Sequence, residues 1–249
     1  IRELIDADVE PIPATMDREE VAMTFRDRDW VSAMVVDADG RLIGRITVDD
    51  IVDVIDEEAE DDMLRLGGVT DSDIFRAVWG TVRARFTWLF INLGTAMMAA
   101  SVIGLFEGTI EKVVALAVLM PVVAGMGGNA GTQTLTVTVR ALAMKELTPG
   151  NARRVIGKEL AVGLTNGLVF ACLAGTISFF WFGHATIGLV LGCAMVINLT
   201  IAALVGILVP LALDRLKIDP AVASGVFLTA ITDSLGFFAF LGLATAFLV

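Results

Sequence analysis

The sequence has 249 residues, of which 56% are apolar, and yet it carries a net charge of −11, a combination that one soluble domain seldom shows. Residues 1–62 hold 20 of the 29 acidic residues against six arginines, whereas residues 63–249 have a net charge of +3. The composition therefore predicts an acidic part followed by an apolar, weakly basic part, and it excludes a single soluble domain.

The acidic part alternates helix and strand signals. A polar helix is predicted after Thr15. It is followed by an apolar run over 32–36, an Asp-Ala-Asp-Gly turn at 37–40 and a strand over 42–47. A turn of this kind between two apolar runs is typical of a β-hairpin. From Val48 the spacing predicts a helix with apolar residues on one face (Ile51, Val52, Ile55, Ala59, Met63) and acids on the other (Asp49, Asp50, Asp53, Asp56, Glu57, Glu60, Asp61). No lysine lies between 48 and 62 to offset the repulsion, which favours a divalent-cation sensor over a merely soluble surface.

The apolar part contains four stretches of membrane-spanning length: 86–106, 113–139, 160–213 and 221–249. The third stretch is too long for one pass and is broken at Gly183-His184. We therefore predict an α-helical membrane protein with five transmembrane helices, at about 86–106, 113–139, 160–182, 187–213 and 221–248.

Loop charge predicts the orientation of these helices, because Lys and Arg near helix ends stay in the cytoplasm. Ten basic residues would lie on one side and only Lys112 on the other. This places the N-terminus in the cytoplasm and the C-terminus outside a multi-pass protein of the cell membrane. His184, in a short outer loop, and the cysteines Cys172 and Cys193, in apolar stretches, are interpreted as lacking any metal-ligand role.

Asp233 lies about midway along the last predicted helix, where inserting a carboxylate costs on the order of 3 kcal/mol. Such an acid normally faces a partner, a cavity or an ion. One alternative is a protonated Asp hydrogen-bonded to a neighbouring helix. No Lys or Arg lies in any predicted span to pair with it, which favours the ion.

The second predicted span is unusually polar for a membrane helix, since Pro121 is followed by four glycines, two amides and four threonines: Gly125, Gly127, Gly128, Asn129, Gly131, Thr132, Gln133, Thr134, Thr136 and Thr138. Close helix packing would also use small residues, but the Asn and Gln favour a water-filled lumen. Hard oxygen donors without soft ligands suit Mg²⁺, which keeps several waters when it binds one or two carboxylates. A two-fold homodimer would present two copies of Asp233 to one divalent cation.

Residues 35–51 resemble the end of a CBS domain, and Pro121 to Gln133, Arg140-Ala141-Leu142-Ala143, Asp219-Pro220-Ala221 and Thr232-Asp233 are similar in order and spacing to the membrane domain of the MgtE family. The resemblance implies a homodimeric, Mg²⁺-selective channel closed by internal Mg²⁺. It implies a CBS domain over 1–62, a connecting or plug helix within 63–85 and a transmembrane domain over 86–249. An N-terminal domain and a first CBS unit of full-length members are absent from this sequence.

The resemblance also implies roles for individual residues. Asp233 resembles the pore acid, with Gly128, Asn129, Gln133, Thr229, Ala230 and Thr232 beside the ion path, while the regulatory Mg²⁺ ligands would be Asp17, Asp29, Asp50, Asp53, Glu58, Asp61 and Asp62. Gly225 departs from members that have Asn there. ATP is a candidate ligand of the CBS domain, lipid surrounds the helices and nucleic acid is not expected as a partner.

Two rival functions stay open. The first is transport of Co²⁺ or Mn²⁺, or coupled Mg²⁺ exchange, although softer metals would usually recruit His or Cys. The second is a membrane-anchored nucleotide sensor, for which a polar span and a central Asp are unnecessary. There is no phosphate-binding loop and no nucleophile motif with a paired His, so an enzyme is not expected and transport would be passive.

Overall fold

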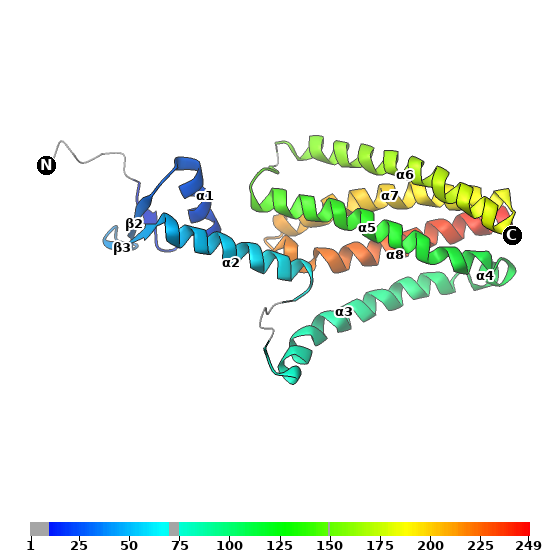
Figure 1. The fold of residues 1–249 in the computed structure, drawn as a ribbon, viewed down its shortest axis with the longest axis horizontal. Helices are drawn as coiled ribbons and strands as arrows, with labels where there is room; N and C mark the ends of the chain where they lie inside the picture. The colour runs from blue at the N-terminus through cyan, green and yellow to red at the C-terminus, as the bar shows by residue number, and fades with distance from the viewer. Residues whose placement is uncertain (1–9, 70–74, 149) are drawn as a thin grey trace. The chain divides into compact units, whose positions relative to one another are not determined.

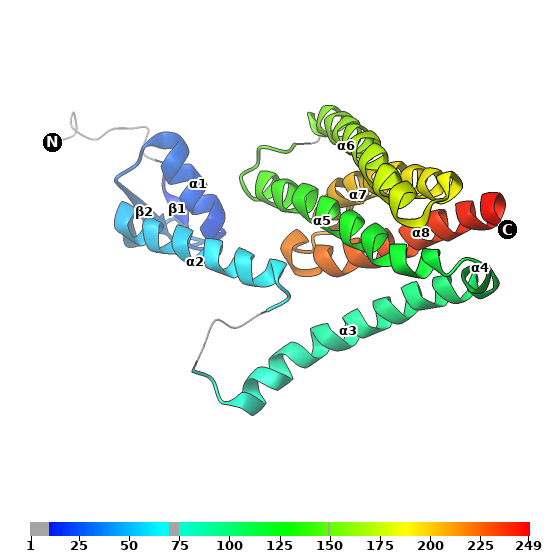
Figure 2. The same cartoon turned by 45° about the vertical axis from the view of Figure 1, so that its right-hand side comes forward.

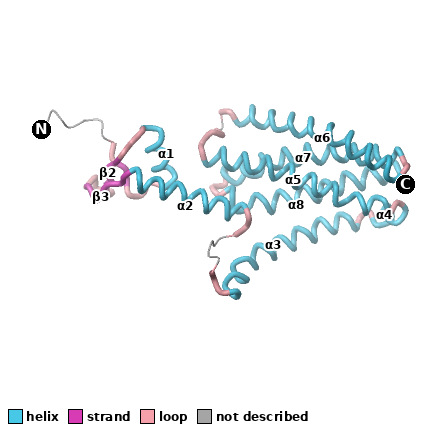
Figure 3. The backbone as a smooth tube through the Cα atoms, viewed as in Figure 1, coloured by secondary structure: helices cyan, strands magenta, loops and turns pink. Residues whose placement is uncertain are grey.

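The computed structural model describes residues 10–69, 75–148 and 150–249, and the chain divides into two compact units, 1–64 and 65–249. The first unit is a small α/β domain and the second is entirely helical in its regular structure (Figure 3). This confirms the predicted fold class.

The first unit contains a three-stranded sheet in the order β1-β2-β3, formed by β1 (Ile12–Pro13), β2 (Ser32–Val36) and β3 (Leu42–Thr47). Strands β2 and β3 form the predicted antiparallel hairpin, while β1 pairs with β2 in parallel. At the turn, Asp37 Oδ1 accepts hydrogen bonds from the amides of Asp39 (3.0 Å) and Arg41 (2.8 Å). Gly40 adopts a φ of 76°, which a residue without Cβ tolerates easily.

Helices α1 (Arg18–Arg28) and α2 (Val48–Leu66) complete this unit. Its core is small and is built from Ile12, Val21, Ala22, Phe25, Ala33 and Ile51. The predicted apolar face of α2 is largely uncovered, because Ile51 is buried whereas Val52, Ile55 and Met63 are exposed. One short sheet and one other helix cannot cover all five turns of α2.

The second unit contains five helices long and apolar enough to cross a membrane: α3 (Val78–Gly104), α5 (Ala115–Ala143), α6 (Ala152–Phe182), α7 (Ala185–Arg215) and α8 (Pro220–Leu248). Between α3 and α5 lies a short helix that was not predicted, α4 (Glu107–Lys112). The break between α6 and α7 falls at Gly183-His184 as predicted, with Gly183 capping α6 at a φ of 70°.

Three of the five long helices extend well beyond the predicted spans, because those spans ended at the first charged residue. Helix α3 begins at Val78 and includes Arg83 and Arg85, and α6 begins at Ala152, eight residues before its predicted start. The predicted connecting helix therefore differs from the structure: residues 78–85 are the first turns of α3, and residues 70–74 lie outside the described residues. The domain limits at 62 and 85 stay predictions.

Helix α7 is the centre of the second unit and packs against α5, α6 and α8, whereas α3 contacts α8 at the edge of the bundle and diverges from it towards its own N-terminal end (Figures 1 and 2). The main core joins α5, α7 and α8 around Leu116, Met195 and Phe240, all fully buried. Helices α6 and α7 approach through glycines, and a Cβ added to Gly188 would lie 2.5 Å from the carbonyl oxygen of Gly175. Such small-residue contacts let helix backbones pack closely in a membrane.

Candidate functional site

Asp233 is the fourteenth of the 29 residues of α8 and is half-buried. Within the described residues, no other acid lies near the middle of a candidate span. No ion pair or hydrogen bond to its carboxylate is found among the described groups of this subunit. The interpretation of Asp233 as an ion site and the alternative of a protonated Asp bonded to a neighbouring helix both stay predictions.

Helix α5 presents polar residues along one exposed face. Gly125, Asn129, Thr132 and Thr136 are all exposed and follow one another at spacings of three or four residues, so they form a single stripe. The helix stays continuous through Pro121 and this glycine-rich stretch. The polar stripe is therefore displayed on an intact helix rather than on unwound backbone.

A cavity of about 620 Å³ lies among α3, α5, α8 and residues 65–69, all within the second unit. Three threonine hydroxyls line it and donate to carbonyls of their own helices: Thr229 to Gly225 (2.6 Å), Thr132 to Gly128 (2.8 Å) and Thr136 to Thr132 (2.9 Å). Each hydroxyl oxygen keeps a lone pair that can accept a further hydrogen bond from water.

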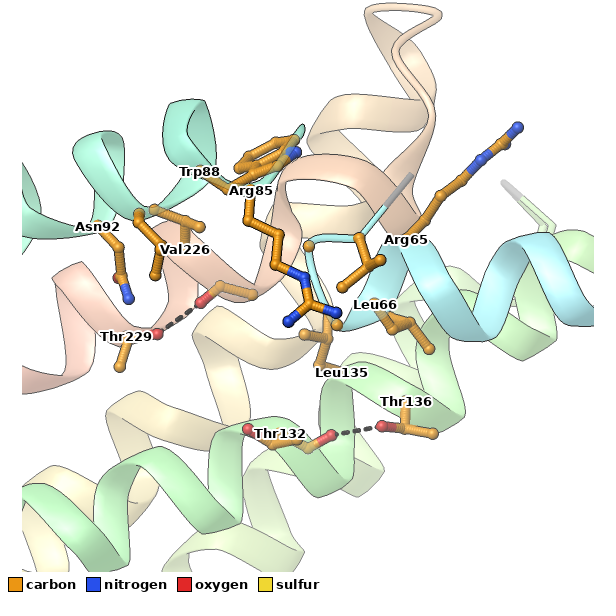
Figure 4. Close-up of a pocket in the computed structure, with 15 residues that line it drawn as sticks. Arg65, Leu66, Arg85, Trp88, Asn92, Thr132, Leu135, Thr136, Val226 and Thr229 are labelled. Atoms are coloured by element: carbon orange, nitrogen blue, oxygen red, sulfur yellow. Dashed lines mark hydrogen bonds between the residues drawn. The ribbon is translucent and has the colours of Figure 1, made fainter. Parts of the chain in front are cut away.

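Arg85 extends its guanidinium from α3 into this cavity, and Trp88 and Asn92 lie on the same helix (Figure 4). The cavity thus combines threonine oxygens with a fixed positive charge. A dication in the cavity would be attracted by the threonine oxygens and repelled by Arg85.

The other predicted path residues lie in different surroundings. Ala230 and Thr232 are buried at 5% and 1% exposure, and the Thr232 hydroxyl donates to the carbonyl of Leu228. Gln133 lines a second cavity of about 170 Å³, among α5, α6 and α7. Of the predicted set, Thr229 lines the larger cavity and Gln133 the smaller, while Asp233, Gly128 and Asn129 line neither.

The smaller cavity contains a carboxylate that the sequence reasoning missed. Glu159 on α6 is only 13% exposed at its side chain, and its Oε2 accepts a hydrogen bond from the Thr134 hydroxyl of α5 at 3.2 Å. Asn166 lines the same cavity two turns further along α6. The predicted span began at residue 160, just past this acid, but the spacing of Glu159, Gly163 and Asn166 marks one helix face and could have revealed it.

The predicted regulatory acids are spread over the first unit, and several already have structural partners. Asp17 is the N-cap of α1 and accepts from the Glu19 amide (2.9 Å), and Asp29 caps the other end in the left-handed conformation. Glu58 forms an ion pair with Arg18 at 2.9 Å, and Arg18 also reaches Glu57 at 3.1 Å. Arg18 therefore links α1 to the acidic face of α2.

Asp50 binds the start of its own helix: Oδ2 accepts from the Thr47 amide (2.9 Å) and the Thr47 hydroxyl (2.8 Å). These hydrogen bonds, the amide first, with a smaller contribution from Arg45, hold the pKa of the Asp50 carboxyl below its ordinary value of 3.8. Asp53 is exposed, and Asp61 and Asp62 are half-buried. Across the described ranges, no three acidic, His or Cys side chains come together as a metal site.

The fold and its polar groups define a multi-pass membrane protein with five candidate spanning helices, an acid at the middle of the last of them and a small α/β domain. The family described as MgtE, divalent cation transporter, matches residues 120–243, and the CBS domain family matches residues 1–57. The chain belongs to the MgtE family, which is described as a family of divalent cation transporters.

Three curated relatives match nearly the whole chain. It is 38% identical to the magnesium transporter MgtE of Enterococcus faecalis over 93% of its length, 38% identical to that of Thermus thermophilus over 98%, and 35% identical to that of Bacillus subtilis over its full length. The alignments cover 51%, 55% and 55% of these relatives. The chain thus spans about half the length of the curated relatives it matches.

Proposed function

We propose that two copies of this chain form a Mg²⁺-selective channel or transporter in the cell membrane, with the two Asp233 carboxylates facing the ion on the two-fold axis. The observation that carries this proposal is the half-buried Asp233 at the middle of α8, which has no ion-pair or hydrogen-bond partner among the described residues. The names of the three relatives, each a magnesium transporter, support the choice of ion.

The uncovered polar stripe of α5 supports a dimer. Exposed Asn129 would face lipid in a single subunit, where an amide is poorly solvated, while Thr132 and Thr136 line the cavity beside it. A second subunit would enclose the stripe together with Thr229 and Asp233 in a water-filled passage. Mg²⁺ would keep several waters there, held by threonine and amide oxygens, and would neutralise the two carboxylates.

Transport in this proposal is passive and inward. The cytoplasm contains the N-terminal domain, and the C-terminus lies outside, as the loop charges predict. An inside-negative potential favours entry of a dication by about 4.6 kcal/mol per 100 mV. No energy-coupling module is then needed.

Regulation would come from the acidic N-terminal domain. With net charge −14 over residues 1–62, two facing domains repel each other when Mg²⁺ is scarce and are bridged when it binds Asp17, Asp29, Asp50, Asp53, Glu58, Asp61 or Asp62. The bridged state closes the passage through the segment 63–85. ATP is a candidate second ligand of the CBS domain.

Mg²⁺ flux into liposomes containing the purified protein tests the proposal. Asp233→Asn should lower the flux about tenfold or more, because each carboxylate interacts strongly with a dication in a poorly solvated site. Asp214→Asn is the matched control, since it removes the same charge from the exposed end of α7. Undiminished flux through Asp233→Asn would reject Asp233 as the ion site, and flux of Co²⁺ or Mn²⁺ without Mg²⁺ would favour the rival ion.

A further inference from the structure

Asn198 lies at the centre of α7 and is completely buried, at 0% exposure. Its side-chain amide Nδ2 donates a hydrogen bond to the backbone carbonyl of Val123 on α5 at 2.6 Å. Its carbonyl Oδ1 has no hydrogen-bond partner among the described residues. The side chain thus ties α7 to α5 and leaves one polar atom unsatisfied.

The same amide fills a slot between glycines of two different helices. A Cβ added to Gly127 of α5 would lie 2.5 Å from Nδ2 and 2.8 Å from Oδ1, and a Cβ added to Gly236 of α8 would lie 2.8 Å from Oδ1. Real Cβ atoms do not approach other atoms so closely. By contrast, a Cβ at Gly125 of α5 would meet nothing within 4 Å.

A buried acceptor without a partner costs free energy that a Leu or Ala at this position would not. Stability alone therefore does not explain the amide. The two glycines that it touches lie close in sequence to the candidate ion site: Gly127 precedes Asn129 by two residues, and Gly236 follows Asp233 by three. The amide is therefore in direct contact with both helices that carry the proposed ion path.

We infer that Asn198 is a positioning residue that sets the spacing of α5 and α8, and through that spacing the ion selectivity of the Asn129 and Asp233 region. This inference rests on the proposed function. The amide acts as a spacer of fixed size: its hydrogen bond fixes α5 at Val123, and its carbonyl end fixes the approach of α8 at Gly236. A shorter side chain lets the two helices shift, so the site loses its preference for the smaller dication.

The test is a double-mutant cycle measured as Mg²⁺ and Ca²⁺ flux into liposomes. Gly127→Ala alone should lower Mg²⁺ flux, because its methyl group collides with the Asn198 amide. In the Asn198→Ala background the same substitution should cost at least about threefold less, since the obstacle is gone. Gly125→Ala, on the same helix, should change the flux by the same factor in both backgrounds.

Selectivity separates positioning from a general loss of folding. Asn198→Ala should raise the ratio of Ca²⁺ to Mg²⁺ flux at least about threefold, whereas a protein that is merely less folded loses both fluxes in proportion.

Two results would overturn the inference. The first is that Gly127→Ala lowers Mg²⁺ flux by the same factor in the wild-type and the Asn198→Ala background. The second is that Asn198→Ala lowers the Mg²⁺ and Ca²⁺ fluxes in proportion. A wild-type protein that carries no Mg²⁺ would instead reject the proposed function. If the wild type carries Mg²⁺ but positions 127 and 198 show no coupling, only this inference is rejected and the proposed function stands.

Discussion

Arg65, in the last turn of α2, forms an ion pair with Asp219, the N-cap residue of α8. The two carboxylate oxygens of Asp219 have separate partners, because Oδ2 meets Arg65 while Oδ1 accepts the amide of Ala221 at 2.8 Å. One side chain therefore both starts the helix that carries Asp233 and connects that helix to the end of α2.

This pair predicts that substitutions at its two ends have the same effect on regulation. Asp219→Asn keeps an N-cap but loses the ion pair, so the free energy of unfolding should fall by less than about 1 kcal/mol, as expected of a partly exposed pair. Under the proposed regulation, the same change should make Mg²⁺ flux less sensitive to Mg²⁺ on the cytoplasmic side. Flux recorded at low and high internal Mg²⁺ measures this, and Arg65→Gln should reproduce it. Unchanged sensitivity in both variants would remove the pair from the gating pathway.

Glu159 and Thr134 predict a stability effect at the α5–α6 contact. Glu159→Leu removes the acceptor of a mostly buried hydroxyl and should lower the free energy of unfolding by about 1–3 kcal/mol. Glu159→Gln can still accept that hydrogen bond and serves as the matched control, with a smaller loss expected. Thermal unfolding in detergent measures both. Equal losses for Leu and Gln would indicate that the charge, rather than the hydrogen bond, matters at this position.

Asp50 predicts an acid-dependent stability of the N-terminal unit. Its folded pKa lies below the ordinary 3.8, so its stabilising effect is fully present above pH 3.8 and disappears as the pH falls through the folded pKa. Asp50→Asn should remove this part of the pH dependence. Hydrogen exchange of residues 10–64 in the intact chain, followed from pH 6 downwards, measures it, with exposed Asp53→Asn as control. Identical acid profiles for wild type and Asp50→Asn would contradict the prediction.

Replacing Arg18 should change the binding of regulatory Mg²⁺, because Arg18 forms ion pairs with both Glu57 and Glu58. Replacing it with Gln frees both carboxylates and removes a nearby positive charge, which at an exposed site corresponds to about 1 kcal/mol, or roughly fivefold tighter Mg²⁺ binding to the acidic segment. Calorimetric titration measures the affinity. Arg26→Gln is the control, since Arg26 pairs with Asp27 on the solvent side of α1. Equal affinity in the Arg18 and Arg26 variants would argue against Glu58 as a ligand.

Sequence patterns predicted the number of spanning helices and the hairpin because both depend on local signals. Length and lack of charge identify membrane helices, Gly183-His184 interrupts the longest run, and the Asp-Gly turn fixes β2 against β3. Helix ends were missed where Arg83, Arg85 and Glu159 continue a helix beyond its apolar stretch. A charge limits the part of a helix that contacts lipid, but it does not end the hydrogen-bonded helix.

The candidate site was harder to predict, because residues close in sequence point in different directions around a helix. Thr229 and Asp233 are four residues apart and share one side of α8, whereas Ala230 and Thr232 turn towards the packed interior. Gln133 likewise faces α6 and not the stripe of Asn129 and Thr132. The role of Asn198 depends on contacts between three helices, and no spacing within α7 could reveal it.

The close approach of Gly175 and Gly188 also limits how this protein can change shape. Gly163 similarly lies against the Ala203 methyl group and the Leu199 carbonyl, and Gly167 against the backbone of Val196, so α6 and α7 pack closely along several turns. Sliding one helix along the other would drive carbonyl oxygens into opposing backbone atoms. Helices α6 and α7 consequently behave as one rigid body. Any motion that opens or shuts a route through the molecule must therefore come from α3, α5 and α8.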